Sequence, residues 1–255
     1  MNEKCKIDLG KELVRHDYQP VELNGGYAGR TLFINLGANE IKEKPLSQQM
    51  KDTFIGGKGF DLKLMWDIVN EQTKWDSPEN AICISPGPLA GTTSYPGSGK
   101  SLVTSISPLT DIPIDSNVGG FFGPFLKFSG FDALAVTGKA NNDVMIHIDG
   151  VEHFIKIQEM TASNEDAHVL CGCLTEQVAP VKTDRQYVSV IAAGRGADNT
   201  FFGILNFSYY DWRRKEARYK QAGRGGIGTV FRDKKILAIV IRCDNWKPKW
   251  SITVG

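Results

Sequence analysis

The sequence lacks the features that mark membrane, secreted or nucleic-acid-binding proteins. No apolar run approaches the roughly 18 residues that a bilayer-spanning helix needs. The amino terminus carries acid among its bases and has no apolar segment of the kind found in a secretory signal. The formal net charge is only +1, from 30 Lys and Arg against 29 Asp and Glu, which gives no support to bulk nucleic-acid binding. We therefore expect a cytoplasmic protein with no membrane span and no nucleic-acid partner.

Side chains that build metal sites or nucleophilic sites are also scarce. The 5 cysteines are an odd number without Cys-x-x-Cys spacing, which fits free thiols in a reducing compartment better than a disulfide framework. The 4 histidines are scattered, and none has a second ligand at metal spacing. No nucleophile–base pair stands out anywhere in the chain. The sequence alone therefore does not indicate hydrolase chemistry.

The composition and the pattern of apolar residues predict a chain of short helices and strands around a hydrophobic core. With 255 residues, of which 41% are hydrophobic, it can bury a substantial core in one large domain or two modest ones. Apolar runs predict strands, and helical spacing or capping residues predict short helices. The predicted strands are 30–36, 81–85, 101–106, 132–137, 144–148, 153–157, 187–193, 202–207 and 236–241, and the predicted helices are 48–54, 60–70, 119–128, 163–176 and 226–232.

Further local predictions concern caps, connections and the two ends of the chain. Ser47 is expected to cap the first helix and Ser163 the fourth. The strands between 132 and 157 are expected to form a meander, 108–116 a loop, and 211–220 a basic, helix-prone connection. Residues 1–24 are expected to form an amino-terminal arm, and residues 246–255 a tail.

Two glycine-rich stretches organise the rest of the chain. In the first, Lys100, Asn117 and a glycine pair beginning at Gly119 surround the expected start of a helix. In the second, Lys220-Gln221-Ala-Gly223-Arg224-Gly-Gly precedes another. Backbone N–H groups and a cation at such a place can face an anion. Both stretches run on through a short helix into an apolar strand, at 117–136 and 221–240, so the sequence predicts two anion cradles and a ligand with two phosphates or two phosphorylated halves.

Simpler or better-known interpretations compete with these cradles. Gly-Ser-Gly-Lys-Ser at 97–101 lacks the first glycine of a nucleotide-binding P-loop, and β-favouring residues follow the lysine where that motif needs a helix. Gly223-x-Gly225-x-x-Gly228 matches the dinucleotide fingerprint, but no clean parallel strand precedes it and the chain ends before a βαβ unit could be completed. Lys100 alone could be a solvated cation and Asn117 a helix cap, and the glycines could simply turn the chain.

An ordered set of motifs resembles one known family. The set comprises Gly-Gly-Tyr-Ala-Gly-Arg-Thr-Leu at 25–32, Gly-Gly-Lys-Gly-Phe at 56–60, Gly-Pro-Leu-Ala-Gly-Thr at 87–92, Ser-Pro-Leu-Thr at 107–110, Ser-Asn-Val-Gly-Gly-Phe-Phe-Gly at 116–123, Gly-Phe-Asp-Ala-Leu at 130–134 and Ala-Gly-Arg-Gly-Gly-Ile-Gly at 222–228. Each motif alone is weak, but their order and spacing are specific. Together they resemble the amino-terminal domain of the tungsten-containing aldehyde:ferredoxin oxidoreductase family.

The resemblance implies an α+β fold in which two mixed β-sheets with short helices form a saddle-like base for a tungsten bis-pterin cofactor. In that family Mg2+ bridges the two pterin phosphates. Asn117 matches the asparagine that binds this ion, and the backbone carbonyl of Gln221 matches its other protein ligand. Lys100 stands where the family usually has an arginine between pterin and iron–sulfur cluster. The positions that line the pterin phosphates are matched by Gly119, Lys220, Gly223 and Arg224.

The resemblance also has departures and implies partners. Lys100 and Lys220 replace common arginines, so a point charge takes the place of a planar fork. The later pterin motifs and the four cysteines of a [4Fe–4S] cluster are expected from domains absent in this chain. The implied organisation is an arm at 1–24, the family's amino-terminal domain at 25–242, and at 243–255 a tail or the start of a linker to missing domains.

The activity implied by the resemblance is that of an anaerobic tungsten-pterin oxidoreductase. It would exchange electrons with ferredoxin or electron-transfer subunits, and it would belong to a homodimer or hetero-oligomer. Its reaction would be either oxidation of an aldehyde to a carboxylate or ring reduction of benzoyl-coenzyme A, as in the tungsten subunit of class II benzoyl-coenzyme A reductases. The catalytic acid or base is not indicated. The alternative is a non-catalytic pterin-binding or assembly domain.

Overall fold

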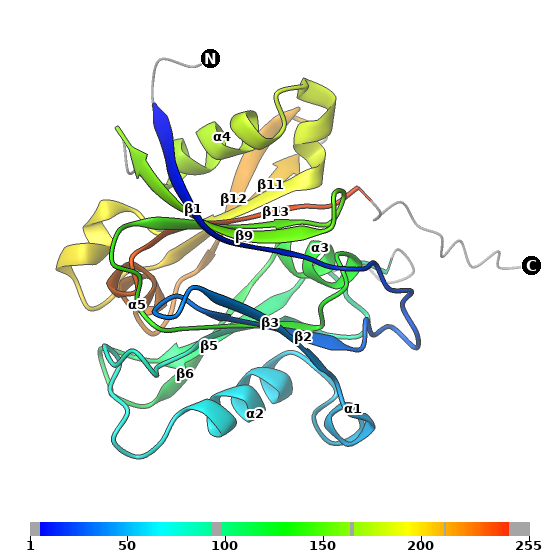
Figure 1. Cartoon of the computed structure of the whole chain (residues 1–255), viewed down its shortest axis with the longest axis vertical. Helices are drawn as coiled ribbons and strands as arrows, with labels where there is room; N and C mark the ends of the chain where they lie inside the picture. The colour runs from blue at the N-terminus through cyan, green and yellow to red at the C-terminus, as the bar shows by residue number, and fades with distance from the viewer. Residues whose placement is uncertain (1–5, 93–97, 164–165, 212, 245–255) are drawn as a thin grey trace, which may run out of the picture.

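Two β-sheets face each other across a layer of short helices (Figure 1). The structure is a computed structural model, and it describes residues 6–92, 98–163, 166–211 and 213–244. The predicted tail at 246–255 therefore lies outside the described residues. The α+β class and the two mixed sheets are confirmed.

Each sheet is antiparallel except for one parallel pair. The smaller sheet has the order β3-β2-β7-β4-β5-β6, and its parallel pair is β2 and β7. Its strands are β2 (Arg30–Asn35), β3 (Glu40–Pro45), β4 (Ile82–Pro86), β5 (Ser101–Ile106), β6 (Pro113–Val118) and β7 (Ala133–Thr137). The larger sheet has the order β1-β9-β8-β13-β10-β11-β12, and its parallel pair is β8 and β13. Its strands are β1 (Ile7–Asp17), β8 (Val144–Asp149), β9 (Phe154–Ala162), β10 (Val188–Ala192), β11 (Leu205–Asp211), β12 (Glu216–Ala222) and β13 (Ile236–Arg242).

The two sheets have the same topology. The run β2-β3-β4-β5-β6-helix-β7 makes the smaller sheet, and β8-β9-β10-β11-β12-helix-β13 repeats it in chain order, sheet position and strand direction. In both, the strand before the helix forms an edge and the strand after it pairs in parallel with the first strand of the run. The similar layouts predicted at 117–136 and 221–240 are therefore the closing halves of two topologically equivalent units.

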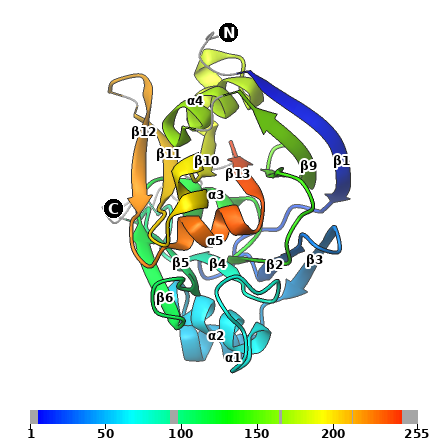
Figure 2. The ribbon, with the colours of Figure 1, turned by 90° about the vertical axis from the view of Figure 1, so that its left-hand side faces the viewer.

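The helices form the inner layer and cover both outer faces (Figure 2). α3 (Phe122–Phe128) and α5 (Ile227–Asp233) lie between the sheets, where Phe122, Phe125 and Phe231 are almost fully buried in the central core. α1 (Gln48–Phe54) and α2 (Lys58–Ile68) cover the outer face of the smaller sheet, and α4 (Ala167–Val178) that of the larger one. Two 3-10 helices, η1 (Lys182–Tyr187) and η2 (Arg195–Asn199), complete the described elements. Among the described helices, none is long and apolar enough to cross a bilayer.

Several local predictions are confirmed because they depend on short-range chemistry. The Ser47 hydroxyl accepts a hydrogen bond from the backbone N–H of Met50 at 3.1 Å, which caps α1 as predicted. The continuous apolar runs form buried strands: every residue of β4 and β10 is buried.

Other predictions are wrong, and in each case a non-local pairing or a competing side chain decides the outcome. The strands between 132 and 157 do not form one meander, because β7 belongs to the smaller sheet and β8 and β9 to the larger. α4 begins after Asp166, whose carboxylate accepts hydrogen bonds from the N–H groups of His168 and Val169, so Ser163 is not its cap. The basic segment predicted at 211–220 is not helical where the structure describes it, because Asp211 ends β11 and residues 216–220 lie in β12. Residues 113–116 of the predicted loop lie in β6.

The amino-terminal arm contributes a strand. β1 pairs antiparallel with β9 and forms one edge of the larger sheet. At this edge His16 Nε2 lies 2.8 Å from Glu43 Oε1 on β3, and Arg30 also pairs with Glu43. The arm therefore ties the two sheets together on the side opposite β6 and β12.

The buried carboxyl group of Asp61 on α2 yields a stability prediction. Burial raises its pKa well above the ordinary value, against the opposing effect of hydrogen bonds from Ser85 at 2.5 Å and Thr104 at 3.1 Å. The folded protein then holds this proton more tightly than the unfolded chain, so its contribution to stability is lost as the pH rises. Asp61→Asn cannot ionise. The free energy of unfolding of Asp61→Asn relative to wild type should therefore increase by about 1.4 kcal/mol per pH unit between the ordinary and the raised pKa.

Urea unfolding at several pH values measures this difference. Asp67→Asn is the matched control, because Asp67 is an exposed carboxylate on the same helix that pairs with Lys63. A difference between Asp61→Asn and wild type that stays constant with pH would contradict the prediction.

Candidate functional site

The two edge strands that precede the central helices lie side by side (Figure 2). Asn117 on β6 pairs with Leu102 of β5, and Gln221 on β12 pairs with Asn206 of β11. Each is the second-last residue of its strand, so Asn117 and Gln221 occupy equivalent places in the two units. Both line one open cavity of about 510 Å3, together with Asp115, Ser116, Gly223 and Arg224.

The remaining predicted site residues lie close to this cavity. A Cβ added to Gly119 would lie 3.8 Å from Cγ of Lys220, so the glycine turn of one unit contacts the edge strand of the other. The Lys220 ammonium lies 5.8 Å from the centre of the Tyr209 ring. Lys100 is exposed and follows Gly99, where an added Cβ would lie 2.6 Å from the carbonyl oxygen of Gly120. The structure thus gathers all seven predicted residues around the junction of β6 and β12.

Asn117 is not a helix cap. It lies within β6 and is exposed, and α3 begins only at Phe122 with Phe121 in the capping position. Within the described ranges its side-chain amide makes no hydrogen bond, which leaves the amide oxygen available to a ligand.

The glycines around the cavity fall into two kinds. Gly225 and Gly226 have φ of +73° and +67°, and a Cβ at either would lie within 2.3 Å of another atom. The fold itself therefore requires glycine at these two positions. Gly119 and Gly223 have no positive φ, and a Cβ at Gly223 would meet nothing within 4 Å. Because neither conformation nor internal packing explains these two glycines, we interpret them as leaving backbone open to a bound group.

The charge around the cavity suits an anion. Within the described part of the chain, Lys100, Lys220 and Arg224 form no ion pair. The one carboxylate in the cavity lining, that of Asp115, is paired with Lys58 at 2.5 Å. Three uncompensated cations thus surround an open surface, where a multiply charged anion gains charge-assisted hydrogen bonds.

A cation bound here would depend on amide and carbonyl oxygens. In the parts of the chain that the structure describes, no three His, Cys, Asp or Glu side chains gather as a metal site. Mg2+ accepts a few protein oxygens and takes the rest of its ligands from phosphates and water. The Asn117 amide and the Gln221 carbonyl are donors of this kind.

Ser116, Asp115 and Lys58 are site residues that the sequence analysis did not assign. The Ser116 hydroxyl accepts a hydrogen bond from the N–H of Arg224 at 3.1 Å and so joins the two units. Ser116 and Asp115 stand directly before Asn117 in the sequence, which is the one signal that could have pointed to them. Lys58 is distant in sequence, and only the packing of α2 on the smaller sheet brings it near.

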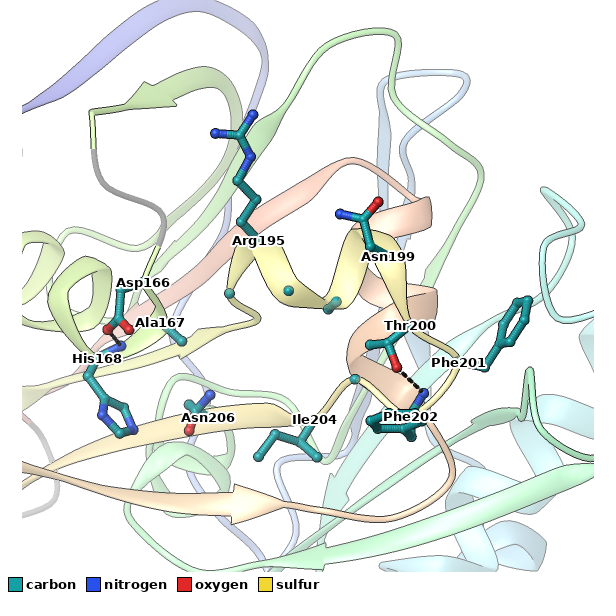
Figure 3. A pocket seen from close by; sticks show the side chains of 14 residues that line it. Asp166, Ala167, His168, Arg195, Asn199, Thr200, Phe201, Phe202, Ile204 and Asn206 are labelled. Carbon is teal, nitrogen blue, oxygen red and sulfur yellow. Dashed lines mark hydrogen bonds between the residues drawn. The ribbon is translucent and has the colours of Figure 1, made fainter.

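A second cavity of about 1020 Å3 lies beyond Gln221 (Figure 3). The Gln221 amide donates a hydrogen bond of 3.3 Å to Asn206, which lines this cavity beside Ile204. The rim carries Phe201 and Phe202, with 57% and 71% of their surface exposed. The cavity lining is therefore mostly apolar, unlike that of the smaller cavity.

Known proteins resemble this chain over most of its length. Residues 31–243 match the family model described as aldehyde ferredoxin oxidoreductase, N-terminal domain. The tungsten-containing aldehyde ferredoxin oxidoreductase of Pyrococcus horikoshii is 32% identical over 222 residues, which cover 85% of this chain and 33% of that protein. The aliphatic sulfonate oxidoreductase, WOR-like subunit, of Pyrococcus furiosus is 28% identical over 231 residues, covering 85% and 34% of the two chains.

A solved structure is also similar. It is the active site complex BamBC of benzoyl coenzyme A reductase in complex with 1,5-dienoyl-CoA, with a TM-score of 0.69 and 27% identity. The match covers 86% of this chain and 31% of that one. The chain therefore spans about a third of the length of the curated relatives it matches.

The two kinds of glycine predict different effects of the same substitution. Gly223→Ala should change the free energy of unfolding by less than about 0.5 kcal/mol, because an alanine there is unstrained and uncrowded. Gly225→Ala should destabilise by about 1–3 kcal/mol, because it forces an alanine to φ of +73° and its Cβ to 2.3 Å from Ile114. Urea unfolding of the two variants measures both values. Equal destabilisation would show that Gly223 is also needed by the fold.

Proposed function

The chain belongs to the aldehyde ferredoxin oxidoreductase family, and from that premise we propose that it is the cofactor-binding amino-terminal domain of a tungsten-pterin oxidoreductase. The family implies a tungsten-pterin cofactor, and the relatives named above are tungsten-containing or redox enzymes. The observation that carries the proposal is the junction of β6 and β12. There Asn117, Gln221 and Gly223 line one open cavity together with the Arg224 cation. Gly119, Lys100 and Lys220 lie beside this cavity.

The residues at this junction fit a cofactor with two phosphorylated halves. We assign one phosphate to the Gly119 turn with Lys100, and the other to Gly223 with Lys220 and Arg224. A magnesium ion between the phosphates would take oxygens from the Asn117 amide and the Gln221 backbone carbonyl, in keeping with its preference for oxygen ligands. When bound, the metal–dithiolene centre supplies the redox chemistry, and this domain supplies binding, orientation and positive charge.

Lys100 also has a proposed role in the electron path. Its ammonium is a compact charge on a flexible stem, so it offers single hydrogen bonds where an arginine would offer a planar fork. We propose that it lies between the pterin and a [4Fe–4S] cluster held by cysteines from other domains. Its exposure is consistent with a side chain that completes its contacts only when those domains are in place.

The apolar rim of the larger cavity supports a proposal about assembly. Phe201, Phe202 and Ile204 are exposed and lie within four consecutive residues, an arrangement typical of surfaces that contact another protein part. We propose that this rim contacts the remaining domains or a partner subunit, in a homodimer or hetero-oligomer that passes electrons to ferredoxin or a dedicated electron-transfer subunit. The domain bounds 25–242 and a cytoplasmic, anaerobic setting belong to the same proposal.

Two reactions remain candidates for the whole enzyme. The similarity to the aldehyde ferredoxin oxidoreductase of Pyrococcus horikoshii supports oxidation of an aldehyde to a carboxylate, and the similar solved structure supports ring reduction of benzoyl-coenzyme A. The non-catalytic alternative, a pterin-binding or assembly domain, would need the same phosphate site but no redox-active metal.

Elemental analysis of the natively purified protein tests the proposed function. Protein prepared without oxygen should contain tungsten, magnesium and, in the complete polypeptide or complex, iron. Mass spectrometry of the metals with an intact-mass measurement on the same sample gives both contents per chain. Protein of full native mass without tungsten or pterin would overturn the enzymatic proposal.

Asn117→Ala should lower the retained magnesium and pterin, because it removes the one side-chain oxygen assigned to the ion. We expect a loss of at least about tenfold in magnesium affinity, as is common for a removed metal ligand or its supporting group. Asn141→Ala, which changes an exposed asparagine between β7 and β8, is the matched control. Unchanged magnesium and pterin content in Asn117→Ala would refute the assigned role.

A further inference from the structure

The turn that leads into α2 contains one residue that the fold does not explain. Gly57 has φ of +54°, and a Cβ on Gly59 would lie 2.3 Å from the carbonyl oxygen of Phe54. These glycines are therefore fixed by the tight connection between α1 and α2. Lys58 stands between them as the first residue of α2, and 58% of its side chain is exposed. Neither conformation nor burial requires a lysine at this position.

The Lys58 side chain reaches the candidate site. Its Nζ lies 2.5 Å from Oδ1 of Asp115, which lines the 510 Å3 cavity with Asn117. Asp115 and Asn117 are two residues apart on β6, so their side chains share one face of that strand. The packing of α2 on the smaller sheet thus places an ammonium group next to Asp115 in the cavity lining, on the strand that carries the proposed magnesium ligand.

The ion pair between Lys58 and Asp115 is not needed for stability. With side chains 58% and 29% exposed, such a pair contributes about 0–1 kcal/mol at most. A stronger partner can therefore displace Asp115 at little cost. A phosphate with two negative charges is such a partner, because charge-assisted bonds to it are short and strong.

The number of cations on each half of the site also supports a phosphate-binding role for Lys58. The half of the site on the larger sheet has two cations, Lys220 and Arg224, whereas the half on the smaller sheet has only Lys100 among the residues assigned so far. Lys58 supplies the second cation, so that each phosphate of a two-phosphate ligand would face two positive charges.

We propose that Lys58 binds phosphate at the half-site of the smaller sheet, and that Asp115 holds it in position until the anion arrives. The ligand class is a phosphate or pyrophosphate ester, with or without a divalent cation. This inference rests on the proposed function, because the phosphate it assigns belongs to the same cofactor site.

Calorimetric titration of the purified protein with inorganic pyrophosphate, with and without Mg2+, tests this assignment. Wild type should bind the probe, and Lys58→Ala should bind it about tenfold more weakly, equivalent to about 1.4 kcal/mol. Lys58→Ala should also show a smaller dependence of affinity on salt concentration. Asp115→Asn should bind at least as tightly as wild type, because it removes the competing carboxylate and keeps the ammonium group.

Lys63→Ala is the matched control, since Lys63 lies on the same helix and pairs with Asp67 instead. It should bind like wild type, and circular dichroism confirms that each variant is folded. Equal affinity of Lys58→Ala and wild type would overturn this inference alone and leave the proposed function standing. An equal loss of pyrophosphate affinity in Lys58→Ala and Asp115→Asn would overturn it too, because the ion pair would then only stabilise the local structure. No binding to wild type would overturn the inference together with the phosphate site on which it rests.

Discussion

The architecture depends on two close backbone contacts. The central helix α3 lies against the first residue of β5, and the central helix α5 lies against the residue that precedes β11. At the second residue of α3, a Cβ on Gly123 would lie 2.1 Å from the Ser101 hydroxyl. At the second residue of α5, a Cβ on Gly228 would lie 2.4 Å from the Ile204 carbonyl oxygen. Only glycine allows both approaches. They seat the helices between the sheets, and the helices in turn set where the edge strands end and where the turns after Asn117 and Gln221 lie.

Sequence reasoning predicted the features that short-range chemistry decides. The Ser47 cap, the buried runs at β4 and β10 and the start of α5 after a glycine cluster all follow from a few adjacent residues. The pairing of strands does not. β7 and β8 are neighbours in sequence but belong to different sheets, because β7 ends the first unit by pairing with β2 and β8 begins the second. The sequence predicted a helix-prone connection where the structure has β12. An exposed edge strand carries charges in a pattern that is equally typical of a solvated helix.

The sequence likewise predicts some parts of the candidate site and not others. The ordered motifs predicted the family, and the comparisons confirm it. The two glycine-rich stretches were predicted to act together, and the topology explains why, since they end equivalent strands that meet at one edge. Lys58 was missed because its proximity to Asp115 arises from the packing of a helix on a sheet, which no local pattern encodes. The roles of the glycines also cannot be read from the sequence alone. Gly223 and Gly225 belong to the same motif, and only their backbone angles and neighbouring atoms show that the fold requires glycine at 225 and not at 223.

The place of β13 has a consequence for the order in which the site can form during synthesis. β13, the last strand among the residues that the structure describes, pairs with β8 on one side and β10 on the other, in the middle of the larger sheet. A growing chain that has released only its first unit therefore has one half-site, and β10, β11 and β12 have no central strand to join until residues 236–242 emerge. A ligand that needs both halves would find its surface only on a chain that has completed this last insertion, so binding would select for finished domains.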